Sequence, residues 1–328
     1  MADMTILIDA YSQIFRSFYA VRLLTDPQGN PVNALYIFTK LLLELEKDYP
    51  TNSGAMLFDC GKVDFRLKLN PDYKANRPPM PDDLQVQIPR LKEMASAFGW
   101  QLFAEPGFEA DDLIGGIVCS NKERNIRIVS SDKDLSQLVT ERVKLLSPAS
   151  GKGGFEERGI DFVVGKFGVG PELIADYLAL VGDSSDNIPG VPGIGPKGAA
   201  DFLKLTGGIE RYLENPELIS GSKYEAKVSG QEELLKRNLQ LVRLRCELPE
   251  SMRDVEKVLQ KRAADWDKIR SLCEEAGFRS IVKYLPAKVV QEVEAQDDLF
   301  ALPQEDKSVK AASPAKSEAE NFVQGELF

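Results

Sequence analysis

The sequence predicts a mainly parallel β-sheet flanked by helices, followed by an α-helical domain and a polar tail. Over the first 165 residues, short apolar runs alternate with amphipathic helical patterns, which is typical of a parallel sheet with helices on both faces. The second half shows helical patterns alone, and apolar residues become sparse from about Lys288 onward. We therefore expect an α/β domain over residues 1–165, an α-helical domain over 166–287 and a disordered tail over 288–328.

The expected strands of the first half are short runs of apolar residues. They lie at Thr5–Ile8, Ala55–Phe58, Gln101–Ala104, Ile126–Val129 and Val143–Leu146. Helical patterns occur at Asn33–Tyr49 and Asp112–Asn121, and a loop rich in Gly and Ser over residues 147–154 closes this half. Sheets of this kind place their functional groups at the carboxyl ends of the strands.

Helices are expected throughout the second half, at Pro171–Val181, Lys197–Leu205, Ile209–Asn215, Gly230–Arg243 and Trp266–Ala276. A turn region rich in Gly and Pro, residues 182–198, separates the first two helices. Such a turn between two helices favours a compact helical hairpin.

The chain has 328 residues and contains no histidine. This excludes nucleophilic catalysis with a histidine base and zinc sites with histidine ligands. Because its cysteines form no Cys-x-x-Cys pair, we expect reduced thiols that take part in packing, at Cys60, Cys119, Cys246 and Cys273. A metal in this protein would have oxygen ligands, which favours magnesium, manganese or calcium.

Nothing in the sequence indicates a membrane or secretion signal. No apolar run approaches the ~20 residues that cross a bilayer, and the N-terminus lacks the basic and apolar segments of a signal peptide. We therefore expect a cytosolic protein without a membrane partner.

Acidic residues directly follow several of the expected strands. Asp9 and Asp59 come after the first two strands, and Asp132 and Asp134 come after the fourth. Others stand at the start of the 112–121 helix and in the Gly-rich turn, namely Glu109, Asp111, Asp112, Asp183 and Asp186. Taken singly, each acid is equally well explained as a helix N-cap or a turn residue. Taken together, they indicate an acidic cluster at one edge of the sheet.

Clustered carboxylates repel one another and persist only beside compensating positive charge. Two divalent cations roughly 3.5–4 Å apart would supply that charge, and they would support an in-line displacement at phosphorus. Such a site needs no histidine.

Three segments resemble motifs of the 5′-nuclease family, which includes the N-terminal 5′→3′ exonuclease domain of bacterial DNA polymerase I and the flap endonucleases. They are Phe108–Asp112, Ser131–Leu135 and Gly182–Val191, and Asp9, Asp59 and Tyr73–Pro81 also match in order and spacing. The resemblance extends from about Thr5 to Pro286. It implies a PIN-like α/β nuclease domain with a helical arch, followed by a helix–hairpin–helix domain.

The resemblance also implies roles for individual residues. Metal binding, by two Mg²⁺ ions for which Mn²⁺ would substitute, is implied for nine acids, namely Asp9, Asp59, Glu109, Asp111, Asp112, Asp132, Asp134, Asp183 and Asp186. In the family, the stretch matching residues 66–92 forms the arch, and Lys74 and Arg77 match catalytic basic residues near the scissile phosphate. The alternative is an ordinary solvated helical segment that happens to be basic.

DNA contacts are expected in the arch and in a helix–hairpin–helix at about residues 188–205. Glycines let the backbone approach a phosphate, and N–H groups at a helix start bind it without reading bases. Family members often hold K⁺ at this turn. The expected DNA-binding residues are Arg16, Arg66, Tyr73, Gly190, Gly193, Gly195 and Lys197. Tyr73 would stack on a base, or alternatively serve as a packing anchor.

The net charge of −10 does not resemble the basic footprint of most nucleic-acid binders. However, nine acids and four lysines from Lys288 onward account for −5 of it, and the remaining −5 becomes +4 without the nine proposed metal ligands. The acidic total is therefore compatible with a DNA enzyme.

The resemblance implies a monomeric, stand-alone bacterial nuclease of the cytoplasm and nucleoid. Its reaction would be hydrolysis of DNA phosphodiesters at 5′ flaps or gaps, with removal of RNA primers in replication and repair. Two alternatives are a catalytically silent flap-DNA-binding protein and a PIN-type ribonuclease. The complete set of acids disfavours the first, and the helix–hairpin–helix with the basic arch disfavours the second.

The tail contains the pattern Gln-x-x-Leu-Phe twice, at residues 296–300 and 324–328. It resembles the peptide by which bacterial polymerases and repair proteins bind the β sliding clamp. Only about 0.05 chance matches are expected in a chain of this length. We therefore expect clamp contacts from Gln296, Leu299, Phe300, Gln324, Leu327 and Phe328.

Overall fold

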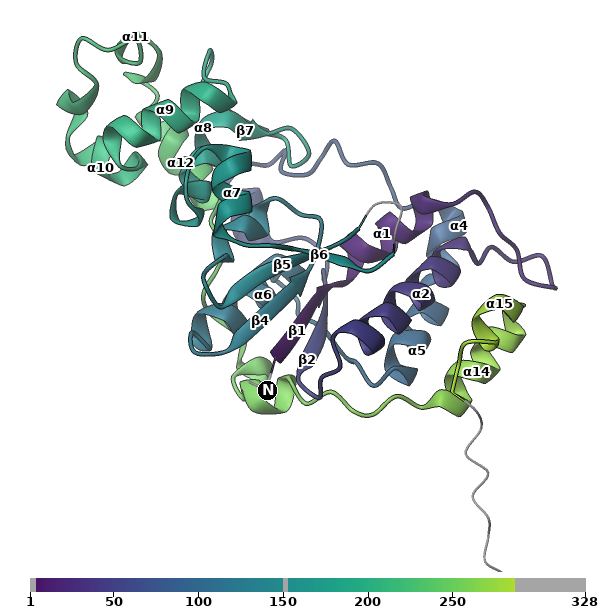
Figure 1. The fold of residues 1–328 in the computed structure, drawn as a ribbon. Helices are drawn as coiled ribbons and strands as arrows, with labels where there is room; N and C mark the ends of the chain where they lie inside the picture. The colour runs from purple at the N-terminus through teal and green to yellow at the C-terminus, as the bar shows by residue number, and fades with distance from the viewer. Residues whose placement is uncertain (1–3, 150–152, 287–328) are drawn as a thin grey trace, which may run out of the picture. The chain divides into compact units, whose positions relative to one another are not determined.

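The computed structural model describes residues 4–149 and 153–286, which build a six-stranded sheet with the strand order β3-β2-β1-β4-β5-β6 (Figure 1). The first five strands pair in parallel and the sixth is antiparallel. Their bounds are Met4–Asp9 (β1), Gly54–Phe58 (β2), Gln101–Ala104 (β3), Asn125–Val129 (β4), Val143–Pro148 (β5) and Phe155–Arg158 (β6). The mainly parallel sheet predicted from the sequence is confirmed.

The edge strand β6 was not predicted. Its sequence, Phe-Glu-Glu-Arg, contains no apolar run, and it pairs only with β5. A strand that is exposed along one edge needs no apolar run, so the criterion that identified the buried strands could not find it.

Helices cover both faces of the sheet because successive residues of each strand point to opposite sides. Leu7 of β1 packs in one core with Leu113 and Ile117 of α6 (Ala110–Ser120). Ile6 and Ile8 pack in a second core, to which helices of the opposite face contribute, namely α1 (Ala10–Ala20), α2 (Asn33–Asp48), α5 (Ile88–Ala97), α14 (Trp266–Glu275) and α15 (Arg279–Val282).

Helix α1 was missed at the sequence level. It begins at Ala10 directly after β1, and the Asp9 carboxylate caps it by accepting the Ser12 N–H at 3.2 Å. Because no loop separates strand and helix, the sequence carries no turn signal at this boundary.

The segment predicted to form an arch contains two short helices, α3 (Asp64–Leu69) and α4 (Asp82–Gln85), joined by turns. The predicted helices of the second half are confirmed, with the first beginning as a 3₁₀ turn at Pro171–Leu173. The helices from Ile160 to Val258 are α7 (Ile160–Phe167), α8 (Ile174–Val181), α9 (Pro196–Thr206), α10 (Ile209–Glu214), α11 (Glu225–Val228), α12 (Glu232–Val242) and α13 (Val255–Val258). The described residues belong to one compact unit, and the predicted tail lies outside them.

A tight hairpin joins α8 to α9. It consists of β7 (Gly182–Asp183), β8 (Ile188–Pro189) and the turn that precedes Pro196. A Cβ on Gly190 would lie 2.2 Å from the carbonyl oxygen of Val181, and Gly193 has a φ of +78°. Both glycines are therefore required by the backbone path, whereas a Cβ on Gly195 would meet nothing within 4 Å.

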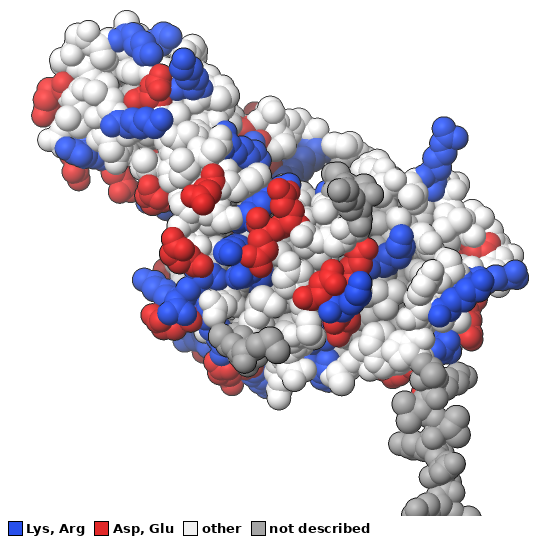
Figure 2. Space-filling model, in the orientation of Figure 1, with Lys and Arg blue, Asp and Glu red and all other residues white. Residues whose placement is uncertain are grey.

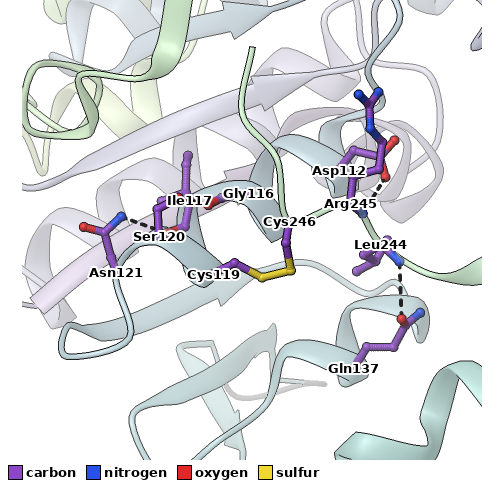
Figure 3. The surroundings of a disulfide bond; sticks show 10 residues. All are labelled: Asp112, Gly116, Ile117, Cys119, Ser120, Asn121, Gln137, Leu244, Arg245 and Cys246. Carbon is purple, nitrogen blue, oxygen red and sulfur yellow. Dashed lines mark hydrogen bonds between the residues drawn. A yellow bond between two sulfur atoms is a disulfide. The ribbon is translucent and has the colours of Figure 1, made fainter. Parts of the chain in front are cut away.

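A disulfide joins Cys119, at the end of α6, to Cys246, in the segment that follows α12 (Figure 3). Our expectation of four reduced thiols is therefore wrong for this pair. The two cysteines are 127 residues apart in the sequence, and only the fold brings them together. Cys60 and Cys273 are free, as expected.

Within residues 4–149 and 153–286, no helix combines the length and the hydropathy that crossing a membrane would require.

The hairpin yields a first prediction with a matched control. Gly190→Ala should destabilise the protein by about 2–4 kcal/mol because its methyl group would overlap the Val181 carbonyl. Gly195→Ala, in extended backbone and open space at the N-cap of α9, should cost no more than about 1 kcal/mol, the loss expected from Ala at a helix N-cap. Denaturant unfolding of both variants checks this, and equal losses would contradict the close-approach argument.

Candidate active site

The acids predicted to gather at one sheet edge do so. Asp9 is the last residue of β1, Asp59 directly follows β2, and Asp132 is the third residue after β4. Together with Asp111 of α6 they line a cleft of about 700 Å³, which also contains Lys74, Arg77 and Lys133. The parallel sheet therefore brings residues more than a hundred positions apart to one cavity.

The carboxylates in this cleft hinder one another's ionisation. Burial and the neighbouring Asp59 raise the pKa of Asp9 to about 7, although Ser130 Oγ donates to Asp9 Oδ2 at 2.7 Å. Burial, Asp132 and Asp9 raise the pKa of Asp111 well above its usual range. Burial likewise raises the pKa of Asp132.

A second group of acids joins the sheet edge to the hairpin after α8. Carboxylate oxygens of Asp134, Asp183 and Asp186 lie within 4.8 Å of one another. Burial and the charge of Asp132 raise the pKa of Asp134 well above its usual range. Burial opposes ionisation of Asp183 too, but hydrogen bonds from Ser185 and the charge of Lys133 lower its pKa overall.

Two of the predicted metal ligands, Glu109 and Asp112, accept hydrogen bonds from a buried arginine. The Arg66 guanidinium is 2% exposed and donates to both oxygens of Asp112, at 2.6 and 2.8 Å, and to Glu109 Oε2 at 3.1 Å. Asp112 is fully buried and also accepts the backbone N–H of Arg245. The position of Arg66 is therefore that of a structural partner for Asp112, and it does not support the predicted DNA contact.

Tyr73, Lys74 and Arg77 contact Glu109 and Asp186. The Tyr73 hydroxyl donates to both acids at 3.1 Å, and Lys74 Nζ lies 2.8 Å from Glu109 Oε1. Arg77 donates to Asp186. Tyr73 is 8% exposed, which corresponds to the packing-anchor alternative and not to base stacking.

The segment around these residues is joined to the hairpin backbone. Lys74, with a left-handed φ of 56°, donates its N–H to Asp186 O, and the Asn187 side chain donates to Asp72 O. Asn76 Nδ2 donates to Ser184 O at 2.6 Å. These bonds fix the two predicted catalytic cations against the second acid group.

The donor set of the cleft fits hard divalent cations. Asp134 Oδ1 is buried and has no hydrogen-bond partner among the residues that the structure describes. Burial and neighbouring carboxylates raise the pKa values of Asp9, Asp111 and Asp134, so a divalent cation beside them would favour their ionised forms. Carboxylate oxygens are the ligands that Mg²⁺ and Mn²⁺ prefer.

The sequence analysis did not assign a role to several residues of the cleft. Lys133 binds Asp183 at 3.1 Å, and its place between Asp132 and Asp134 was a signal that could have identified it. Lys166 of α7, Tyr11 and Phe15 also line the cleft, but no local pattern marks them. Arg16 is exposed on α1 and donates to the Pro148 carbonyl at 3.0 Å.

The predicted helix–hairpin–helix residues lie together at the start of α9. Gly193 O accepts Lys227 Nζ at 3.0 Å, Gly195 is the N-cap residue of α9, and Lys197 is exposed in its first turn. On the face drawn in Figure 2, basic and acidic groups are interspersed over the surface. The groups suited to contact a phosphate backbone are therefore those at the start of α9, and the net charge of the protein does not supply this contact.

Comparison with known proteins agrees with this architecture. Residues 4–168 match the family model of the 5′-3′ exonuclease N-terminal resolvase-like domain, and residues 169–266 match that of the 5′-3′ exonuclease C-terminal SAM fold. A 5′-3′ exonuclease from Aquifex aeolicus is 38% identical over 279 residues, which are 84% of this chain and 93% of that protein. DNA polymerase I from Pseudomonas aeruginosa is 43% identical over 189 residues, which are 57% of this chain and 20% of the polymerase.

Solved structures show the same fold. The zinc-bound T5 5′-exonuclease has a TM-score of 0.59 at 25% identity, over 83% of this chain and 99% of the T5 chain. The catalytic core of Rad2, solved with a DNA substrate, has a TM-score of 0.56 at 14% identity, over 88% of this chain and 93% of the catalytic-core chain.

These matches define a nuclease of the α/β and SAM-fold class. The chain belongs to the 5′-3′ exonuclease family. It spans about a fifth to two fifths of the length of the DNA polymerase I relatives that it matches.

The crowded carboxylates yield a prediction about stability. Asp111→Asn should raise the melting temperature of the metal-free protein, with a gain of about 1–3 kcal/mol at pH 8. The folded-state pKa of Asp111 lies above the unfolded value. Ionisation of Asp111 therefore does not destabilise the wild type below about pH 4, and it destabilises the fold increasingly as the pH rises. The gain should therefore be smaller at pH 5 than at pH 8.

Thermal unfolding in a chelating buffer at both pH values checks this. The exposed Asp72→Asn serves as the control and should shift the melting temperature little at either pH. A wild type that is more stable than Asp111→Asn at pH 8 would show that the acids do not repel one another as described.

Proposed function

We propose that this protein is a structure-specific 5′ nuclease that hydrolyses phosphodiester bonds in DNA with 5′ flaps or gaps. The observation that carries this proposal is the meeting of two acid groups, one at the sheet edge and one on the hairpin that leads into the helix–hairpin–helix. The T5 flap endonuclease, of similar fold, is described in complex with DNA and metal ions, and the Aquifex relative is named a 5′-3′ exonuclease.

We propose two Mg²⁺ ions as the cofactor, with Mn²⁺ as a substitute. Asp9, Asp59, Asp111 and Asp132 would hold one side of this centre, and Asp134, Asp183 and Asp186 the other. When bound, the ions would activate water and neutralise charge at the reacting phosphate. Glu109 and Asp112, which bind Arg66, would act by positioning the N-terminus of α6, where Asp111 lies.

The basic side chains of the cleft would orient the phosphate. Lys74 and Arg77 line the cleft with Asp59 and Asp111, so each can exchange a carboxylate partner for a phosphate oxygen without leaving the cavity. Hydrogen bonds from Ser185 and the charge of Lys133 lower the pKa of Asp183 and favour its ionised form. These groups bind and orient the substrate, and the carboxylates supply the metal ligands.

The helix–hairpin–helix would bind duplex DNA away from the cleavage site. Gly193, Gly195 and Lys197 present backbone N–H groups and a cation at the start of α9, which suits phosphate binding without base readout. A K⁺ ion at this turn is part of the proposal. Two alternatives are disfavoured. A catalytically silent DNA-binding protein would have no use for crowded acids that cost stability. A PIN-type ribonuclease would lack the helix–hairpin–helix.

The cellular role that we propose is removal of flaps and RNA primers in bacterial replication and repair, by a monomer in the cytoplasm near the nucleoid. Recruitment would involve the β sliding clamp, through the two Gln-x-x-Leu-Phe segments of the tail. These segments lie outside the described residues, and the support for this step is their sequence pattern. Leu-Phe pairs in a polar segment are suited to an apolar pocket of a partner.

The acids generate the test of the nuclease itself. Asp132→Asn and Asp183→Asn should each lower magnesium-dependent cleavage of a 5′-labelled flap duplex by at least about a hundredfold, because both belong to the proposed metal centre. Binding of the same flap in calcium should persist. Asp72→Asn is the matched control and should cleave normally, whereas full turnover in either site variant would refute the two-metal proposal.

The cations of the cleft generate a separate prediction. Lys74→Ala and Arg77→Ala should lower the cleavage rate by about ten- to a thousandfold and duplex affinity much less, because they act at the reacting phosphate. Lys197→Ala should instead weaken duplex binding and reduce the salt dependence of affinity by about one unit. Single-turnover cleavage and binding titrations distinguish the two effects, and a parallel loss of affinity in all three variants would contradict this division.

The tail generates its own prediction. Replacing Leu299, Phe300, Leu327 and Phe328 together by Ala should abolish clamp binding measured by calorimetry, while replacing either pair should weaken it, since two weak contacts gain from avidity. Cleavage of free flap DNA should be unchanged in every variant. Absence of wild-type binding, or unchanged affinity in the combined variant, would remove the clamp from the proposal.

A further inference from the structure

The Cys119–Cys246 disulfide lies where solvent can reach it. Cys119 is half-buried at the end of α6, whereas Cys246 is exposed in the segment after α12 (Figure 3). The two Cα atoms are 5.4 Å apart, a separation that a disulfide spans without backbone movement. An incoming thiolate can therefore reach the sulfur of Cys246 more easily than the sulfur of Cys119.

The segment that carries Cys246 packs directly on the helix of the active site. A Cβ on Gly115 would lie 2.7 Å from Arg245 O, and one on Gly116 would lie 2.6 Å from the Leu248 side chain. The Arg245 N–H donates to Asp112 Oδ1 at 3.2 Å (Figure 3). The disulfide therefore links the far end of α6 to a segment that also contacts its first turn.

Cys246 also lines a groove of about 610 Å³ with an excess of positive charge. Its basic residues are Lys236, Arg243 and Arg245, against Glu210 and Glu247. Arg243 binds Glu210 at 2.9 Å and the exposed Lys236 binds Glu233 at 2.8 Å, both in surface ion pairs from which an anionic group can displace the carboxylate. Such a groove suits a small molecule with a net negative charge, of the size of a tripeptide.

We propose that Cys119 and Cys246 form a thiol–disulfide exchange site for a small anionic thiol. The thiolate attacks Cys246 Sγ, the disulfide breaks, and the Cys119 thiolate leaves and takes up a proton. A second thiol then attacks the mixed disulfide on Cys246 and releases the oxidised small molecule. The protein disulfide gains two electrons and two protons, and two small thiols are oxidised to one disulfide.

The proposal uses one element of the proposed function, which is the cytoplasmic compartment. That compartment keeps most thiols reduced, and disulfides found there are usually transient or redox-sensing. An exposed disulfide is the labile kind. The chain would therefore exchange between a reduced form and the cross-linked form described here.

Reduction should loosen the segment at residues 243–248 and lower thermal stability. Because the cross-link closes a loop across 127 residues, its loss should reduce the melting temperature by about 5–15 °C. Amide hydrogen exchange in the same segment should become faster in the reduced protein, since Arg245 and Leu248 then depend on packing and hydrogen bonds alone.

The direct test equilibrates the full chain with glutathione buffers of varied reduced-to-oxidised ratio, followed by alkylation and intact mass measurement. We expect a two-electron transition, loss of the transition in Cys119→Ser/Cys246→Ser, and a glutathione adduct on Cys246 in Cys119→Ser. A pair that stays reduced in oxidised glutathione, or equal melting temperatures for the two forms, would overturn the proposal.

The groove is tested by its charge. Lys236→Gln/Arg243→Gln should slow reduction by glutathione about threefold or more, and should slow reduction by 2-mercaptoethanol clearly less, because its only charge is that of the attacking thiolate. Equal rates with glutathione would refute the role of the groove. Flap cleavage separates the two proposals: active nuclease without exchange overturns only this inference, and exchange in an inactive protein overturns only the nuclease.

Discussion

Electrostatic repulsion among the carboxylates at the sheet edge is the constraint on which the rest of this structure depends. The parallel strands bring Asp9, Asp59 and Asp132 to one place, and α6 adds Asp111. Burial strengthens their repulsion because it removes the water that would screen it, and it raises the pKa of Asp9 to about 7. Cations beside this edge therefore favour the ionised forms of these acids and stabilise the fold.

Part of that positive charge comes from the chain. Arg66 neutralises Asp112 inside the protein, Lys74 and Arg77 contact Glu109 and Asp186, and Lys133 binds Asp183. None of these cations lies on a strand, so the compensation joins three parts of the molecule: the segment after β2, the loop after β4 and the hairpin after α8. Four of the acids proposed as metal ligands still have raised pKa values, namely Asp9, Asp111, Asp132 and Asp134. Because the hairpin continues into α9, the same contacts fix the helix–hairpin–helix relative to the cleft.

Much of this could be predicted from the sequence. Apolar runs identified the five parallel strands, and the acids after them identified the edge, because the carboxyl ends of parallel strands necessarily meet. The partners of individual side chains could not be predicted in this way. Arg66 was expected on DNA, yet it is buried on Asp112, 46 residues away. The sequence could not distinguish whether Tyr73 stacks on a base or serves as a packing anchor. The Cys119–Cys246 pairing depends on how the segment after α12 returns to α6. Such choices are made by three-dimensional packing and leave no periodic signal.

We propose that divalent cations supply the positive charge that the chain does not provide at the sheet edge. Calorimetric titration of the protein with Mn²⁺ at pH 7, in two buffers of different ionisation enthalpy, tests it most directly. Because metal ligands must be deprotonated and Asp9 titrates near pH 7, we predict two bound ions per chain and a measurable release of protons to the buffer. Binding without proton release, or no binding at all, would contradict the account.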